Sequence, residues 1–433
     1  MAVGANYLHI YYKNKMNKLS LKQALFIMAA LPVSAMAQGT NDGLGGGDVD
    51  IKSLYELVTK HEQKSKAFNI YINYGTSYQT TRDSREGEWT SRLYNRDLRL
   101  EMVGWLTDNI YYRFRHRLTK SNTAESEDNF AKATDYMMVG WKFNDHWSIQ
   151  GGKKCQALGS FEFDENTLFV YQFSDIENCI ESSKAAINLV YNATPDQQFS
   201  AEISNTYTGK LKDEFGENAK VTTGKVMSSS DDETTTVDTQ LLEKANHPLS
   251  YTAGWNGKFF GGKLQTRWSY TLRTLAKHKY SRMVRLGQKL NLDHLHWYID
   301  YNMTYDDLDR MRIASKETVS VMAPQETNLY VGKVRYQGLV TKLEVDLVPD
   351  WKFEAKGMYE TASMTQSEQY KNYRKALGYV GTLEYYPARK QQQNLRFFLS
   401  YTGRKYDYSK RSMLSDYHTD RIELGMLYRM KLL

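Results

Sequence analysis

The residues with the clearest chemistry are three arginines at every second position, Arg113, Arg115 and Arg117. Apolar side chains such as Tyr112 and Phe114 alternate with them. A period of two is that of a β-strand, so the guanidinium groups are predicted to share one face and the apolar residues the other. A guanidinium group binds a carboxylate or a phosphate through two parallel hydrogen bonds. The row is therefore suited to attracting small anions.

The same alternation assigns further basic residues to the polar faces of other predicted strands. Acidic residues on these faces are fewer and more scattered, so the polar faces are predicted to carry an excess of positive charge. The predicted basic set is Arg113, Arg115, Arg117, Arg267, Arg273, Arg285, Lys289, Arg396, Arg404, Arg421, Arg429 and Lys431.

The elements that would position these residues are about sixteen amphipathic segments that begin at Phe68. Many run for about ten residues, the length that a tilted strand needs to cross a bilayer. Short links alternate with long polar links, and a medium link at 387–393 stands where a short one is due. The long links include 120–132, 156–184, 209–247, 305–332 and 364–374. Short turns on one rim and long loops on the other are typical of a transmembrane barrel.

Two folds could use such strands. In a soluble sandwich the apolar faces would form the core, whereas in a membrane barrel they would face lipid and the arginines would line a water-filled lumen. The link pattern favours the barrel, and no segment after the N-terminal region approaches the roughly 18 apolar residues of a membrane helix. We therefore predict an all-β fold, a transmembrane antiparallel β-barrel of about sixteen strands over 68–433, with short periplasmic turns and long extracellular loops.

Closing this barrel would place the last two strands beside the first three. Arg396, Arg404 and Arg421 would then share a basic wall with Arg113 and Arg115, and the wall would concentrate anions. The alternative is that the charges hydrate a wide lumen and pair with the acids opposite, as in a general porin.

The N-terminal region has the pattern of an export signal. Four lysines precede an apolar run from Ala24 to Val33, and Ala35-Met36-Ala37 follows. This pattern predicts a signal peptide over 1–37 with cleavage before Gln38, and of the two possible starts, Met1 and Met16, Met16 is the more natural initiator. Its removal leaves 53 basic and 50 acidic residues, so any anion preference must come from where the charges lie. Residues 38–67 are predicted to be a periplasmic linker and a short amphipathic helix within 49–66.

Three segments resemble the phosphate-selective porin O and P family as it occurs in Bacteroidetes-type bacteria. They are RDLRLEMVGWLTDNIYYRFRHRL at 96–118, VGWKFNDHWSIQGGKKCQALGSFEFD at 139–164 and the closing GMLYRMKLL. The resemblance implies a trimeric, sixteen-stranded, anion-favouring diffusion channel in the outer membrane of a Gram-negative bacterium. Phosphate-specific members of the family line the pore with lysines, whereas this chain uses mostly arginine.

The resemblance also assigns a role to the loop over 156–184, the third on the exterior rim. In sixteen-stranded porins this loop folds inward and narrows the pore, whereas the alternative is an ordinary solvated loop. Cys155 and Cys179 bracket most of this loop, and a disulfide or two free thiols are both consistent with the sequence. The candidate constriction residues are Phe161, Glu162, Phe163, Asp164, Glu165, Asp175 and Glu177.

The function predicted from these features is passive diffusion of small solutes, such as phosphate or organic anions, through an outer-membrane porin. Its partners would be outer-membrane lipid, small anionic solutes and two further copies in a homotrimer, with no nucleic acid and no cofactor. No catalytic cluster stands out, and His294 with His296 has no third ligand for a metal. The alternative is a non-conducting barrel that acts as an adhesin, an export-complex partner or a membrane enzyme.

Overall fold

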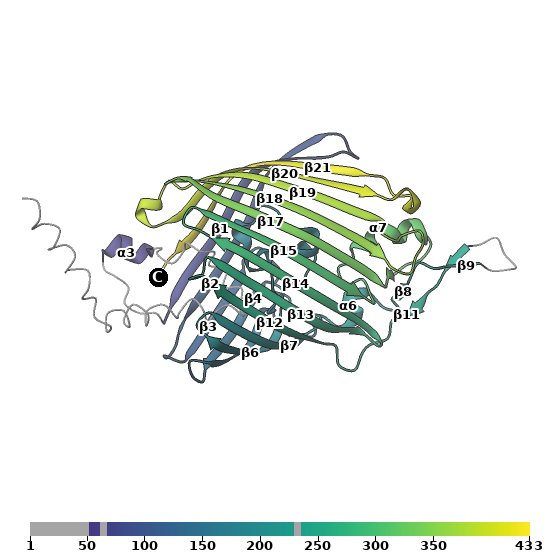
Figure 1. Ribbon diagram of the computed structural model, residues 1–433, viewed down its shortest axis with the longest axis horizontal. Helices are drawn as coiled ribbons and strands as arrows, with labels where there is room; N and C mark the ends of the chain where they lie inside the picture. The colour runs from purple at the N-terminus through teal and green to yellow at the C-terminus, as the bar shows by residue number, and fades with distance from the viewer. Residues whose placement is uncertain (1–51, 61–66, 229–234) are drawn as a thin grey trace, which may run out of the picture. The chain divides into compact units, whose positions relative to one another are not determined.

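The computed structural model describes residues 52–60, 67–228 and 235–433. Sixteen antiparallel strands follow one another around a closed barrel, in which β21 pairs with β1 (Figure 1). The barrel strands are β1 (Asn69–Asp83), β2 (Trp89–Trp105), β3 (Ile110–Arg117), β4 (Thr134–Lys142), β5 (Trp147–Cys155), β6 (Ser183–Thr194), β7 (Gln197–Asn205), β12 (Leu249–Phe259), β13 (Leu264–Ala276), β14 (Lys279–Asn291), β15 (Leu295–Asp306), β17 (Val334–Val348), β18 (Trp351–Met364), β19 (Arg374–Tyr385), β20 (Asn394–Tyr408) and β21 (Tyr417–Lys431).

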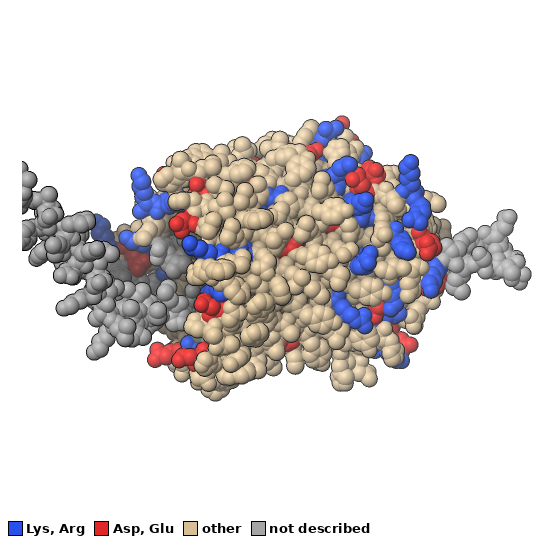
Figure 2. Space-filling model, in the orientation of Figure 1, with Lys and Arg blue, Asp and Glu red and all other residues tan. Residues whose placement is uncertain are grey.

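The side chains of these strands are inverted relative to a soluble protein. On β4, Met137, Val139 and Trp141 point outward and are about half exposed, while Tyr136 and Met138 point inward and are buried. Figure 2 shows a largely uncharged outer surface over the strands, with charged side chains gathered toward the end that carries α6 and α7. The inner face instead holds fully buried charged groups such as Arg285. The predicted transmembrane barrel is therefore confirmed, because an apolar exterior around a charged interior suits a bilayer.

The two rims differ as predicted, with two exceptions. The turn rim has links of two to eight residues, and the longest of them is the expected link at 386–393. The loop rim carries the long links, which we call L2 (118–133), L3 (156–182), L4 (206–248), L6 (307–333), L7 (365–373) and L8 (409–416). Its two other links are short, L1 at 84–88 and L5 at 277–278. L5 can be this tight because His278 adopts a left-handed backbone conformation with φ of 56°.

The long loops fold into structure of their own at the loop rim. L4 contains α6 (Leu211–Phe215), β8 (Lys220–Thr222), β9 (Val226–Ser228), β10 (Thr235–Val237) and β11 (Gln240–Leu241). L6 contains α7 (Ile313–Met322) and β16 (Leu329–Val331), and β8 pairs with both β11 and β16. Side chains from L3, L6 and L7, including Ile176, Met311 and Tyr370, form one buried apolar cluster with inner-face residues of the barrel.

One carboxylate organises the start of L6. The Asp309 side chain accepts hydrogen bonds from Tyr336 Oη at 2.7 Å and from the backbone N–H of Arg312 at 3.0 Å. It also accepts from the Ser315 backbone N–H and hydroxyl, both at 2.8 Å. Burial raises the pKa of Asp309 to about 6, although these hydrogen bonds act in the opposite direction.

A short N-terminal helix lies within the segment 49–66. In the described residues it spans α3 (Leu54–Thr59), begins with a capping box between Ser53 and Glu56, and ends at Lys60 in the left-handed conformation. The Tyr55 N–H donates to the Leu432 carbonyl, which places α3 at the turn rim. The predicted signal peptide and most of the predicted linker lie outside the described residues. None of the described helices is long and apolar enough to span a membrane.

The inner face of β4 supplies a test of this packing. Tyr111 lies across Gly140, where an added Cβ would fall 2.1 Å from the ring. We expect Gly140→Val to destabilise the barrel by about 1–3 kcal/mol, because the ring is held there by a hydrogen bond from Gln150. The measurement is the temperature at which detergent-solubilised protein loses its folded gel mobility. Gly151→Val is the control, since its Cβ would meet no atom within 4 Å, and equal losses in both variants would contradict the assignment.

Candidate functional site

All twelve predicted basic residues lie on the inner face of the barrel. On each strand these residues stand at the same alternate positions as buried residues, and the side chains between them are more exposed. Arg396 and Arg404 on β20 are examples. Three of the twelve, Arg273, Lys289 and Lys431, have no ion pair among the described residues, although Lys289 Nζ lies 5.9 Å from the centre of the Phe161 ring. The electrostatic state of the other residues is different from the one expected.

The predicted basic wall is largely neutralised by carboxylates. Arg113 on β3 and Arg429 on β21 both contact Glu101 on β2, each at 2.7 Å. Asp135 on β4 contacts Arg117 at 2.7 Å, Arg115 at 3.3 Å and Arg99 at 3.4 Å. The wall formed by β20, β21, β1, β2 and β3 exists as predicted, but its arginines do not form a bare positive surface. A buried charge without a partner is costly in a low-dielectric interior, which explains the pairing.

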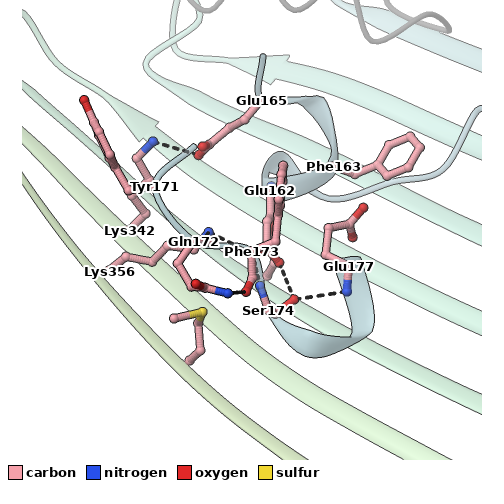
Figure 3. Close-up of polar contacts among 12 residues, drawn as sticks. Glu162, Phe163, Glu165, Tyr171, Gln172, Phe173, Ser174, Glu177, Lys342 and Lys356 are labelled. Atoms are coloured by element: carbon pink, nitrogen blue, oxygen red, sulfur yellow. Dashed lines mark hydrogen bonds and ion pairs between the residues drawn. The ribbon is translucent and has the colours of Figure 1, made fainter. Parts of the chain in front are cut away.

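L3 enters the lumen and lies along the inner wall, rather than forming a solvated surface loop. It contains α4 (Phe161–Asp164), the short helix η1 (Thr167–Phe169) and α5 (Asp175–Asn178). Figure 3 shows Glu162 of α4 at its centre: the carboxylate contacts Lys356 of β18 at 2.8 Å and accepts hydrogen bonds from the Ser174 N–H and hydroxyl at 2.8 and 2.7 Å. Glu162 therefore joins the two halves of L3 to the barrel wall.

The other predicted acids of L3 also meet basic residues of the wall. Glu165 contacts Lys342 of β17 at 2.9 Å (Figure 3), and Glu177 contacts Arg285 of β14 at 2.9 Å. The remaining pairs are Asp164 with Arg267 of β13, Asp175 with Arg374 of β19, and Asp175 with Arg404 of β20 at 2.7 Å. The five predicted acids thus fasten one loop to six different strands.

Carboxylates of the wall bind the N-terminal ends of the two L3 helices. Asp300 of β15 accepts from the backbone N–H groups of Phe161 and Glu162 at 3.0 and 2.8 Å. Glu360 of β18 accepts from those of Asp175 and Ile176, both at 2.9 Å. These N–H groups have no partner within their helices, so the wall supplies the acceptors that the loop needs.

The two predicted aromatic residues of L3 are buried against arginines of the wall. The Phe161 ring lies 5.4 Å from Arg267 Cζ and 6.1 Å from the ring of Tyr298. The Phe163 ring lies 5.2 Å from Arg285 Cζ. Both rings therefore cover guanidinium groups and reduce the access of water to them.

Cys155 and Cys179 are both free thiols in the structure, which is one of the two possibilities that the sequence left open. Cys155 ends β5, where its Sγ lies 3.6 Å from the Ser183 hydroxyl and 3.9 Å from that of Ser182. Cys179 follows α5 and packs at the edge of the apolar cluster of L3, L6 and L7.

Two functional residues were missed because β-bulges interrupt the alternation. The register between β1 and β2 shifts at Gly75 and Thr76, so Arg96 has no paired residue on β1. The side chain of Arg96 consequently points into the lumen. Arg96 contacts Glu423 at 2.7 Å and donates to the Val170 carbonyl of L3 at 2.7 Å. A second shift between β3 and β4 turns Asp135 inward. Gly75 itself is the only sequence signal for the first bulge.

The same shift also decides which way Tyr94 points. On this part of β2 the inward residues are Arg92 and Tyr94, which pair with Gln79 and Ser77 of β1. Leu93 points outward and is 83% exposed. Arg92, Arg96 and Arg421 consequently lie near one another, and we call them the outer arginine cluster.

A cavity of about 210 Å³ adjoins this cluster. Arg421, Arg404, Thr402 and Gln172 line it on one side, and the outer ends of β1 and β2 with L1 line the other. Arg421 is a quarter exposed and contacts Glu423 at 3.4 Å. Two guanidinium groups of the outer arginine cluster, those of Arg96 and Arg421, thus contact the buried carboxylate of Glu423, and Arg92 lies near Arg421.

The described residues contain no group of three or more His, Cys, Asp or Glu side chains that could hold one metal ion. His294 and His296 stand at the turn between β14 and β15.

The closed barrel with an inward-folded third loop defines the protein as a bacterial outer-membrane porin by fold. The outer membrane channel DcaP of Acinetobacter baumannii is similar with a TM-score of 0.54 and 9% identity, over 84% of this chain and 97% of that chain. An anion-selective porin from Comamonas acidovorans gives 0.50 and 8%, over 84% and 99%. A Salmonella typhi OmpF complex with daunomycin gives 0.50 and 10%, over 84% and 97%. At these identities the likeness shows the fold.

The family follows from a sequence profile. The profile of phosphate-selective porin O and P matches residues 68–430, and the chain belongs to this family. The resemblance stated from three segments is confirmed, and the matched range begins at the predicted start of the barrel. No curated protein matches the chain. Family and fold together make the protein a passive-diffusion porin of the outer membrane.

The anchoring of L3 can be tested at Glu162. In Glu162→Gln the buried Lys356 loses the only carboxylate it contacts among the described residues, and keeps neutral acceptors such as the Gln172 carbonyl at 2.8 Å. We expect a barrel that unfolds at lower temperature, by about 3–5 kcal/mol of lost stability, and larger fluctuations of single-channel current as L3 loosens. Both are measured on purified protein, the second in planar bilayers.

Glu165→Gln is the matched control. Its partner Lys342 retains Glu344 at 2.9 Å and Glu354 at 3.2 Å, so the lysine stays paired. Equal current noise in the two variants would contradict the view that Glu162 holds the loop.

Proposed function

We propose that the porin favours anions, and that small phosphates or organic anions are the solutes it admits. The observation that carries this proposal is the outer arginine cluster beside the cavity, in which Arg96 and Arg421 contact Glu423 and Arg92 lies near Arg421. Three guanidinium groups and one carboxylate leave an excess of positive charge within the cluster, whereas the carboxylates of Asp83, Glu86, Glu88 and Asp420 line the cavity beside it. Such an excess at the entrance of a lumen with low-dielectric walls raises the local concentration of anions.

The deeper basic residues contribute less to selectivity. Arg113, Arg115, Arg404 and Arg429 are buried as well as paired with carboxylates, whereas the Arg421 side chain is a quarter exposed, so the deeper guanidinium groups are less accessible to solute. Selectivity is therefore proposed to arise at the outer entrance, while the paired residues and L3 set the width of the passage. The anion-selective porin from Comamonas acidovorans is consistent with this proposal through its fold alone.

The further expectations for export and lipid belong to the same proposal. A cleaved signal peptide over 1–37 would deliver the chain to the outer membrane, and lipid would contact the outward apolar residues. Support for the lipid contact comes from exposed side chains such as Leu399, Leu424 and Ile187 on the outer face. No catalytic or cofactor role is proposed.

Charge selectivity gives a direct test at Arg96. We expect Arg96→Gln to lower the anion-to-cation permeability ratio by about fivefold, the factor that one unit charge contributes at about 4 Å in water. The ratio is measured from reversal potentials of single channels in a salt gradient. Arg282→Gln removes the same charge from the outward face of β14, where the side chain is exposed, and serves as the control. An unchanged ratio in Arg96→Gln, or a cation preference of the unmodified channel, would contradict the proposal.

We also propose that the homotrimer forms through the wall of β3, β4 and β5. These strands span only eight or nine residues, whereas β17 to β21 span twelve to fifteen. In addition, β2 pairs with β3 only from Arg99 onward, so its outer end has one edge without a strand partner in the barrel. A low wall with an open strand edge is suited to contact with another copy.

This interface can be located by cysteine cross-linking in intact outer membranes. We expect Val139→Cys on β4 to form cross-linked dimers with a bifunctional thiol reagent, because each added thiol can be joined to only one other. Leu377→Cys on β19 is the control, because the two side chains are 49% and 48% exposed on different walls of the barrel. Cross-linking of Leu377→Cys but not of Val139→Cys would place the interface elsewhere.

A further inference from the structure

Buried polar atoms that lack a hydrogen-bond partner are concentrated in one part of the described chain. They lie on the inner face of β13, β14 and β15 and at the adjoining start of L6. The register sets Ser281 between Arg273 and Asp306 on neighbouring strands, and Asn302 beside Arg285. Since most buried polar groups in proteins have a partner, such a concentration requires a cause. The atoms are Arg273 Nε, Ser281 Oγ, Arg285 Nε and Nη2, Asn302 Oδ1 and Nδ2, Asp306 Oδ2, and Arg310 Nε and Nη2.

Arg273 and Arg310 differ from the other buried arginines of the described barrel. Arg273 is fully buried, and its hydrogen bonds are one to Gln156 Oε1 at 3.4 Å and one to Met283 Sδ at 4.0 Å. Arg310 is 8% exposed, and within the described residues neither arginine forms an ion pair. By contrast, Arg404 contacts two carboxylates and Arg285 contacts Glu177 at 2.9 Å.

The charges around Arg273 do not balance. The charged groups that act most strongly on it are Arg310, Asp306 and Arg285. The carboxylate of Glu177 compensates Arg285, which leaves two guanidinium groups and the one carboxylate of Asp306. An uncompensated positive charge in a buried site is costly unless an anion accompanies it.

The donors also have the geometry that an oxyanion requires. Arg310 and Arg285 each have both Nε and Nη2 without a partner, and these two atoms form the edge through which a guanidinium group binds two oxygens side by side. The Ser281 hydroxyl and the Arg273 Nε lie on the neighbouring strands. Asp306 Oδ2 can accept a hydrogen bond from a protonated oxygen of the same anion.

We propose that Arg273, Arg310 and Ser281 form a buried site for a small oxyanion, which is a resident of the fold and not the permeating solute. The anion supplies the missing negative charge and joins the start of L6 to the wall of β13 and β14. Arg310 directly follows Asp309, so the anion and the Asp309 hydrogen bonds hold the same turn before α7. The site is independent of the outer arginine cluster and of the anion preference of the channel.

The experiment is crystallography of the full mature protein in detergent with arsenate, an oxyanion whose anomalous scattering locates it. We expect an arsenic peak within hydrogen-bond distance of Arg273 and Arg310. The peak should disappear in Arg310→Gln, a loop substitution that leaves every barrel strand unchanged. It should remain in Arg312→Gln, whose guanidinium lies in the same loop and is paired with Glu214 at 3.1 Å. Arsenate only at the outer arginine cluster, or an adventitious ion only at the surface, would overturn the proposal.

A second measurement uses the unmodified protein and so does not depend on the folding of a variant. Proteinase K cleavage within 307–333 is followed in phosphate and in chloride at equal ionic strength. We expect cleavage to be slower in phosphate by about tenfold when phosphate exceeds its dissociation constant tenfold. Equal rates in the two salts would overturn the proposal.

Discussion

The exclusion of charge from the outer surface of the barrel determines most of the remaining structure. Outward positions on the strands are apolar and exposed, so almost every charged strand residue must point into the lumen. There the charges are close together and shielded from water, and each needs a partner. The shared carboxylates of Glu101 and Asp135 are the result, because each serves two or three arginines from neighbouring strands.

The charges of L3 and of the barrel wall also pair with one another. The acids of L3 meet basic residues from β13 to β20, and wall carboxylates receive the free N–H groups of its two short helices. A loop of this length would not otherwise hold one conformation, because its helices of four residues are too short to be stable alone. The basic wall therefore has a structural role in addition to its effect on solute.

The sequence predicted the barrel closely because a period of two is visible in each strand. The structure has the sixteen strands that the alternation predicted, and the predicted basic residues lie on the inner face. The prediction fails where the period of two is interrupted. The bulge at Gly75 reverses the outer half of β2, so Arg96 was missed. The pairing of Asp135 with three arginines could not be predicted either, because it depends on a register shift and on the closure of the barrel.

The course of L3 has a consequence for biogenesis. Its side chains contact strands that are synthesised long after it, up to Arg404 on β20, and its backbone reaches Arg421 on β21. Arg404 and Arg421 stand on the last two strands, and β21 closes the barrel by pairing with β1. L3 therefore completes its contacts only at the end of synthesis, when these strands are in place.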